Sequence, residues 1–284
     1  MVDPAPDPAP DPGKDDLRLA RIYTYPVKSC GGVALGRAEL GDRGLRYDRR
    51  YTLVDGESRF LSQRRLPRMA LVSASVSGGY LLLSAPGMSD LTLPLEPAPG
   101  ELGSRLPVRI FDDVTEGATA DPGADRWFGE FLGVECRLVY MPDDVERPVD
   151  PSYARKGDRV GFADGFPLLM FSEASLADLN SRLPEPVTEN RFRPNLVVSG
   201  ASVFAEDGWK RVRVGEVDLR VAKPCSRCTI TTVDQTTGEK GQEPLRTLAS
   251  YRRTGGKVMF GQNLAHDALG ELAVGQPVEV LERA

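Results

Sequence analysis

The stretch KPCSRCTITTVD, residues 223–234, places two cysteines three positions apart beside an arginine, in a chain that has only four cysteines. Half of a zinc site would need two more Cys or His ligands, and the remaining Cys30, Cys136 and His266 show no paired spacing. A thioredoxin-like dithiol should open a helix, whereas the β-branched run at 229–233 predicts a strand. Neither interpretation fits the segment well.

A third interpretation is a single thiolate that binds a soft metal, with Lys223 and Arg227 nearby to favour the charged sulfur. The spacing alone favours a fourth, a pair of buried structural cysteines. Residues 211–222 alternate apolar and polar side chains around a Gly-Glu turn, which predicts a hairpin that leads directly into this segment.

Short β-type runs separated by turn residues occupy much of the remaining chain. Strands are predicted at 17–23, 50–54, 70–76, 80–83, 108–111, 137–141, 167–171, 195–199 and 278–280. Helices are predicted at 124–132, 173–183 and 244–252, with Ser172 as the N-cap of the second. The fold class is therefore mainly β (α+β). The Pro-, Asp- and Arg-rich loop 142–161 predicts a boundary between two domains, residues 17–145 and 146–284.

Charge and composition argue against several classes of protein. The net charge of -5 and the pI near 5.2 disfavour binding to nucleic acid or to an anionic membrane. The first 16 residues, MVDPAPDPAPDPGKDD, predict a disordered tail without a targeting signal. No apolar run is long enough to span a membrane, so we expect a cytoplasmic monomer with reduced cysteines. One histidine leaves little basis for a multi-histidine zinc site or a Ser-His-Asp hydrolase.

Locally, basic side chains predict an anion site despite the negative net charge. Arg191 and Arg193 stand with Asn195 at the start of an apolar strand, and guanidinium groups bind phosphate through bidentate hydrogen bonds. The turn YPVKSCGG at 25–32 adds an ammonium, a hydroxyl and glycine amides, a weak signal by itself. A phosphorylated small cofactor is the ligand that this pattern suggests. Solvated faces are expected for Arg43, Arg46, Arg65 and Arg68.

In order and spacing, these motifs resemble the MOSC family, molybdenum-cofactor-binding proteins that include the mitochondrial amidoxime-reducing component and its bacterial relatives. The matching segments are YPVKSC (25–30), DRRYTLVD (48–55), SEASLADLNSRL (172–183), NRFRPNLVVSG (190–200), AEDGW (205–209), CSRCTITTVD (225–234), EPL (243–245) and FGQN (260–263). The resemblance implies two packed β-barrel-like domains with a few peripheral helices and the pterin cofactor held between them.

The resemblance also implies roles for individual residues. Cys228 becomes the molybdenum ligand and the catalytic residue, and Cys225 a structural neighbour. Contacts to the molybdopterin are implied for Lys28, Ser29, Arg49, Ser172, Arg193, Asn195 and Arg227. The implied activity is reduction of small N-hydroxylated compounds. Asp234 and Glu243 could shuttle protons or could equally cap turns.

Two departures from the family shape the expected partners. Bacterial relatives often append a ferredoxin domain, but this chain has too few cysteines for an iron–sulfur cluster. Electrons are therefore expected from a separate ferredoxin, cytochrome b5-like protein or flavin reductase. The length leaves no room for the pyridoxal-phosphate part of a cofactor sulfurase, so no pyridoxal phosphate is expected. The alternatives are a non-catalytic carrier of the molybdenum cofactor, a sulfur-transfer module, or a cofactor-free β-barrel with structural thiols.

Overall fold

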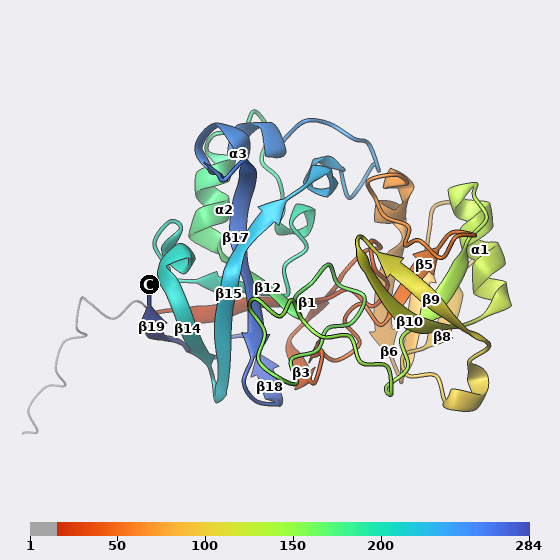
Figure 1. The fold of residues 1–284 in the computed structure, drawn as a ribbon. Coiled ribbons are helices and arrows are strands. Elements are labelled where there is room, and N and C mark those ends of the chain that lie inside the picture. Colours follow the sequence, from red (N-terminus) through yellow and green to blue (C-terminus); the bar gives the residue numbers. More distant parts are fainter. Residues whose placement is uncertain (1–15) are drawn as a thin grey trace, which may run out of the picture.

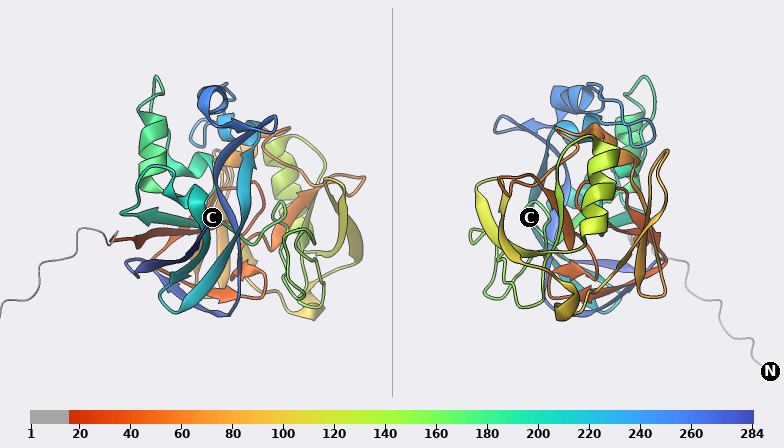
Figure 2. Two further views of the ribbon diagram at one scale, coloured as in Figure 1. Left: turned by 60° about the vertical axis from the view of Figure 1, so that its left-hand side comes forward. Right: turned by 90° about the vertical axis from the view of Figure 1, so that its right-hand side faces the viewer.

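The computed structural model describes residues 16–284, so the tail predicted over residues 1–16 lies outside the described residues except for Asp16. Two lobes built around strands lie side by side (Figures 1 and 2). The described chain is mainly β, with three α-helices and several sheets, as the sequence predicts. Within residues 16–284 no helix is both long and apolar enough to cross a membrane.

The lobe on the left of Figure 1 contains the largest sheet. Its strand order is β19 (Val278–Arg283), β14 (Trp209–Val214), β15 (Val217–Arg227), β17 (Lys257–His266), β12 (Leu168–Ser172), β13 (Leu196–Ser199), β1 (Arg18–Thr24) and β2 (Val33–Leu35), with β16 (Arg253–Thr254) beside β17. A smaller sheet joins β18 (Gly270–Ala273) to β3 (Arg37–Gly41) and β4 (Gly44–Leu45). Both sheets thus combine segments from the two ends of the chain. The domain boundary expected between residues 145 and 146 stays a prediction.

The other lobe packs two antiparallel sheets against a helix. One sheet contains β5 (Tyr51–Val54), β11 (Arg137–Tyr140), β10 (Asp113–Thr119) and β9 (Arg105–Ile110), and the other contains β6 (Ser73–Ser77), β7 (Tyr80–Ser84) and β8 (Leu91–Pro94). Helix α1 (Pro122–Leu132) buries Trp127, Phe128 and Phe131 in the core, as the spacing of its aromatics predicts. The Asp121 carboxylate accepts a hydrogen bond from the Ala124 amide at 2.7 Å and caps its first turn.

Two further helices and five short 3-10 turns complete the structure. They are α2 (Glu173–Asn180), α3 (Leu245–Tyr251), η1 (Pro67–Leu71), η2 (Pro99–Glu101), η3 (Glu189–Arg191), η4 (Ala205–Gly208) and η5 (Thr229–Thr232). Ser172 caps α2 as predicted, because its Oγ accepts a hydrogen bond from the Ser175 amide at 3.1 Å. The predicted helix at 173–183 ends early, at Asn180, and the predicted strand at 70–76 begins only at Ser73, after η1.

The strand predicted at 229–233 is wrong, because the chain forms η5 there. The Thr231 and Thr232 hydroxyls donate to carbonyl groups three residues earlier, at 3.0 and 2.9 Å. Such local side-chain hydrogen bonds compete with the ladder of a sheet, so β-branched residues need not be extended. The consequence is a tight turn directly after Cys228.

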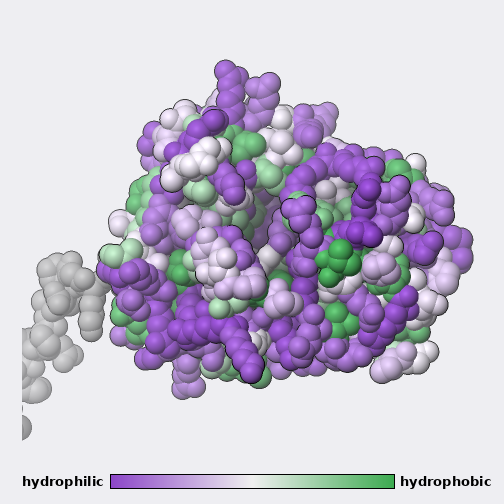
Figure 3. Space-filling model, viewed as in Figure 1, coloured by the Kyte–Doolittle hydropathy of each residue, from purple (hydrophilic) through white to green (hydrophobic). Residues whose placement is uncertain are grey.

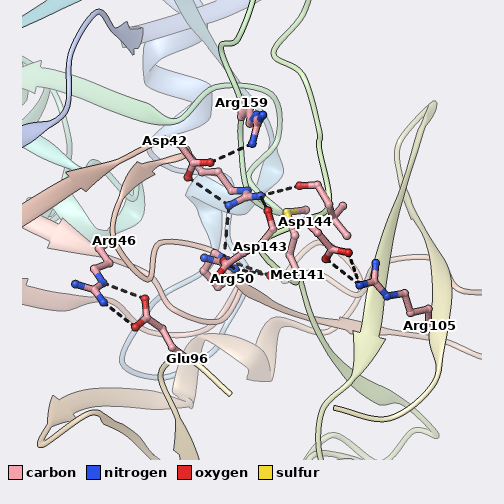
Figure 4. A network of polar contacts seen from close by, with 11 residues as sticks. Asp42, Arg46, Arg50, Glu96, Arg105, Met141, Asp143, Asp144 and Arg159 are labelled. Carbon is pink, nitrogen blue, oxygen red and sulfur yellow. Dashed lines mark hydrogen bonds and ion pairs between the residues drawn. The ribbon is translucent and has the colours of Figure 1, made fainter. Parts of the chain in front are cut away.

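The expectation of a solvated face is wrong for Arg43. Its side chain is only 6% exposed, and Nη2 donates to the carbonyl groups of Asp143 and Val145, both at 2.7 Å. Arg50 pairs with the Asp143 carboxylate at 2.6 Å (Figure 4). These two arginines hold the start of the loop 142–161. The expected exposure is confirmed for Arg46, Arg65 and Arg68.

Candidate functional site

A cavity at the end of β15 collects seven of the eight residues that the sequence analysis singled out. Its volume is about 140 Å³, which at roughly 10–15 Å³ per water leaves room for about ten water molecules. The seven residues are Lys28, Ser29, Arg49, Arg193, Asn195, Arg227 and Cys228. Figure 3 shows that the molecular surface is hollowed between the two lobes on the face drawn in Figure 1. We call this space the Cys228 cavity.

Three of these residues have backbone conformations that L-amino acids rarely adopt. Ser29, Arg49 and Arg193 have φ angles of 68°, 48° and 55°. Each such residue costs roughly 1–3 kcal/mol, which persists only where surrounding structure imposes it. Their concentration around one cavity supports a functional role for it, because strained backbone gathers at ligand-binding sites.

Both cysteines of the C-x-x-C segment line the cavity. Residues three apart on a regular strand point to opposite faces, but the pairing of β15 with β17 shifts register between Pro224 and Ser226. This irregularity and the turn η5 bring Cys225 and Cys228 to the same space. Burial raises the pKa of the Cys225 thiol, so Cys225 is a protonated wall residue at neutral pH.

The cation that reaches Cys228 comes from the other half of the chain. Arg64 Nε donates to Cys228 Sγ at 3.4 Å, and its Nη2 lies 3.4 Å from the Asp164 carboxylate. Lys223, which the sequence analysis placed near the thiol, instead pairs with Asp150 at 3.7 Å. The sequence marked Arg64 only as one of several arginines that could bind an anion and did not place it beside Cys228, because 164 positions separate the two residues.

Lys28, which is buried, forms an ion pair with the exposed carboxylate of Asp164 at the edge of the cavity. Lys28 is 5% exposed, and burial lowers the pKa of its ammonium to about 8 although Asp164 opposes the shift. Burial would raise the pKa of Asp164, but the charges of Lys28, Arg64 and Arg49 outweigh it and hold that pKa at about 2. The sequence analysis missed Asp164, whose one local signal is its place in a turn before a buried strand.

Asn195 and the two arginines form a connected network. The Asn195 side chain accepts from Arg49 Nη1 at 3.2 Å and from the Leu169 amide at 3.2 Å, and it donates to the Tyr23 carbonyl at 3.1 Å. Asn195 therefore lines the cavity and also holds the Arg49 side chain in place. Arg193 Nη1 donates to the Cys30 carbonyl at 2.6 Å. These three side chains thus tie together four segments of the chain, at residues 23–30, 49, 169 and 193–195.

The donors around the cavity fit an anionic cofactor. Two of them, Arg193 Nη2 and Arg227 Nη2, are buried and have no hydrogen-bond partner among residues 16–284. An orphaned guanidinium N–H is a strong donor for a phosphate, because buried polar groups need partners. The residues present therefore suit a ligand that carries a phosphate or several acceptor atoms.

The protein contributes few metal ligands of its own. Over the described range, no group of three or more His, Cys, Asp and Glu side chains could hold a metal ion. A metal at Cys228 would need most of its ligands from a bound cofactor. Thiolates and sulfur-rich ligand sets suit soft transition metals, so a sulfur-bearing cofactor is the matching partner.

Four residues considered from the sequence lie outside the Cys228 cavity. Ser172 is fully buried, and its Oγ is occupied with Ser175, so the structure does not bring it to the site. Asp234 pairs with Arg191 at 2.7 Å, and the Glu243 carboxylate accepts from the Thr247 amide at 3.0 Å. Neither carboxylate lines the cavity, and His266 lies within β17 away from it.

Comparison with known proteins assigns both halves of the chain. Residues 157–279 match the MOSC domain, and residues 16–135 match the MOSC N-terminal beta barrel domain. Mitochondrial amidoxime-reducing component 1 of Mus musculus is 38% identical over 281 residues, 93% of this chain and 82% of that protein. The protein of that name from Homo sapiens is 37% identical with the same coverage. Molybdenum cofactor sulfurase of Oryza sativa subsp. japonica is 34% identical over 90% of this chain but only 33% of its own length.

Proposed function

The chain belongs to the MOSC family and is homologous to the mitochondrial amidoxime-reducing components, and from this premise we propose that it is a molybdenum-cofactor-dependent reductase of N-hydroxylated compounds. The observation that carries the proposal is the position of Cys228. Its thiol lines a cavity beside two arginines that each have a buried, unpartnered nitrogen, and no cluster of metal-ligating side chains exists within residues 16–284.

Each side chain has a part that follows from its contacts. Cys228 supplies the protein's sulfur ligand, and Arg64 stabilises that sulfur through its hydrogen bond. Arg193 and Arg227 bind the anionic part of the cofactor, and Arg49 is held in place by Asn195. Lys28 and Asp164 place an ion pair in the wall of the cavity, where the ammonium of Lys28 can contact the cofactor.

When bound, the cofactor supplies two-electron reduction, in which an N–OH group with two electrons and two protons becomes N–H and water. We propose that the electrons come from a separate ferredoxin, cytochrome b5-like protein or flavin reductase, and that the protein acts in the cytoplasm. Small N-hydroxylated amidines or bases are the proposed substrates, because the similar proteins are named amidoxime-reducing components.

A second candidate function is a carrier of the molybdenum cofactor or a sulfur-transfer module. The similarity to part of a molybdenum cofactor sulfurase favours it. Such a protein would bind the cofactor through the same residues without turnover. The two functions therefore differ in catalysis and not in binding.

The test compares Cys228→Ala with Cys225→Ala, because both thiols line the cavity. We expect wild type and Cys225→Ala to hold near-stoichiometric molybdenum and pterin, and to reduce benzamidoxime with dithionite-reduced methyl viologen as donor. Cys228→Ala should lose both molybdenum and turnover. Full activity in Cys228→Ala would refute the proposal, and loaded wild type without turnover would favour the carrier.

A further inference from the structure

One large aromatic side chain near the Cys228 cavity stays in solvent. Phe111 is 53% exposed, and it is the first of the two residues that join β9 to β10, because Ile110 pairs with Asp113. In Figure 1 this hairpin points towards the lobe that carries Cys228. The ring therefore belongs to the surface between the two lobes.

The backbone of Phe111 has a conformation that a bulky side chain disfavours. Its φ is 55°, and a hairpin loop with positive φ at its first position normally holds glycine or asparagine there. For a phenylalanine such an angle is an outlier that surrounding structure has to impose. An apolar ring that is both strained and exposed contributes little to folding, so its reason has to be sought in binding.

Two contacts hold the Phe111 ring in one orientation. It meets the Phe60 ring edge to face, with the ring centres 5.0 Å apart, and the Arg64 guanidinium lies 4.8 Å from its centre. Lys28 Nζ lies in turn 4.9 Å from the centre of the Phe60 ring. Contacts of these kinds fix a ring without covering it, and the exposed part of Phe111 is left for a further partner.

The two cations beside these rings also reach the Cys228 cavity. Arg64 Nε donates to Cys228 Sγ at 3.4 Å. Arg64 and Lys28 both pair with the carboxylate of Asp164. Asp164 lines the cavity while its side chain is 56% exposed, which places this carboxylate at the mouth. One guanidinium thus separates the Phe111 ring from the sulfur that is proposed to bind molybdenum.

We propose that Phe111 is a specificity-determining residue, on which a planar ring of the substrate stacks while its N–OH group enters the Cys228 cavity. This inference rests on the proposed function and narrows its substrates to N-hydroxylated compounds that carry an aromatic or heteroaromatic ring. A single ring suits a small molecule better than an electron-donor protein, whose docking would need a patch of many side chains.

The test compares the binding of benzamidoxime with that of acetamidoxime, which has a methyl group in place of the ring. Calorimetric titration of the oxidised, molybdenum-loaded protein without a donor measures affinity in the absence of turnover. Wild type should bind benzamidoxime at least about tenfold more tightly than acetamidoxime, as expected for one stacked ring. Phe111→Asn should reduce this preference to less than about threefold, whereas Phe111→Tyr should retain it.

Two features of the design separate ring binding from damage to the fold. Asparagine tolerates a positive φ, so Phe111→Asn should fold as wild type does. Tyr80→Asn is the matched control, because Tyr80 is an aromatic residue that is 56% exposed on β7, in a different sheet, and it should leave the preference unchanged.

Turnover with reduced methyl viologen gives a second measurement. Phe111→Asn should raise KM for benzamidoxime and keep kcat, because a ring contact made equally in the ground and transition states affects KM alone. A small donor is used so that a defect in docking a donor protein cannot produce this result.

An unchanged preference in Phe111→Asn, no preference in wild type, or an equal loss of affinity for both compounds would overturn the proposal. Failure of the proposed function is distinguishable from these results. Ring preference without any turnover counts against the reductase, whereas turnover without ring preference counts against Phe111.

Discussion

Replacing Arg43 by methionine should destabilise the protein far more than the same change at Arg46. The two arginines are three positions apart, yet their side chains are 6% and 42% exposed. Methionine keeps the apolar stem and removes the guanidinium in both cases. Arg46 forms ion pairs at the surface with Glu39 and with Glu96, the second of which Figure 4 shows. Such exposed pairs contribute roughly 0.2–1 kcal/mol.

The magnitude for Arg43 follows from its two hydrogen bonds. Each bond from a charged donor to the Asp143 or Val145 carbonyl contributes roughly 1.5–3 kcal/mol, and the carbonyl groups are only partly rehydrated after the change. Relief of the buried charge offsets part of the loss. We expect Arg43→Met to lower the free energy of unfolding by about 3 kcal/mol. Arg46→Met should lower it by less than about 1 kcal/mol.

Urea unfolding followed by tryptophan fluorescence measures this difference. At about 2–4 °C per kcal/mol, the Tm of Arg43→Met should fall by roughly 6–12 °C. The slope of the urea transition should be unchanged, because the surface exposed on unfolding is the same. If the two variants unfold within about 0.5 kcal/mol of each other, burial at Arg43 does not have the energetic role argued from its contacts.

Three other predictions concern the site and α2. The pKa of Asp164, about 2, lies below its ordinary value, so the ionised carboxylate stabilises the fold above about pH 4 and this stabilisation is lost towards pH 2. Asp164→Asn should therefore flatten the dependence of the urea midpoint on pH between these values, and an unchanged curve would contradict this. Ser172→Ala should lower the free energy of unfolding by about 1 kcal/mol through loss of the N-cap of α2. The control Ser250→Ala, at an exposed position, should lower it by less than about 0.5 kcal/mol, and equal values for the two variants would count against the cap. Arg64→Gln should speed the loss of molybdenum on dialysis several-fold, because it removes the hydrogen bond to Cys228 Sγ. Arg65→Gln should not, because the Arg65 side chain is 68% exposed, and equal rates of loss would exclude a role for Arg64 in holding the metal.

Local patterns were sufficient for the fold class and for much of the secondary structure. Aromatic spacing predicted α1, and a serine before an acidic first turn predicted the cap of α2, because both signals act within a few residues. The same reasoning failed at 229–233. There, threonine hydroxyls bond to nearby carbonyls and form a 3-10 turn, so the preference of β-branched residues for strands was overridden.

The order of motifs also picked out part of the Cys228 cavity, since seven of the eight residues that it singled out line it. Their chemical types, thiol, guanidinium, ammonium and amide, are readable in the chain itself. Ser172 shows the limit of this approach, because its hydroxyl is used in capping a helix.

Contacts between distant segments could not be read from the chain. Arg64 reaches Cys228 across 164 positions, and Lys28 pairs with Asp164 across 136. Arg43 and Arg46 look alike in sequence, yet only packing against the loop after β11 buries one of them. The physical reason is that residue type and spacing specify which groups can bind an anion or a metal, whereas burial and charge pairing depend on which segments the folded sheets bring together.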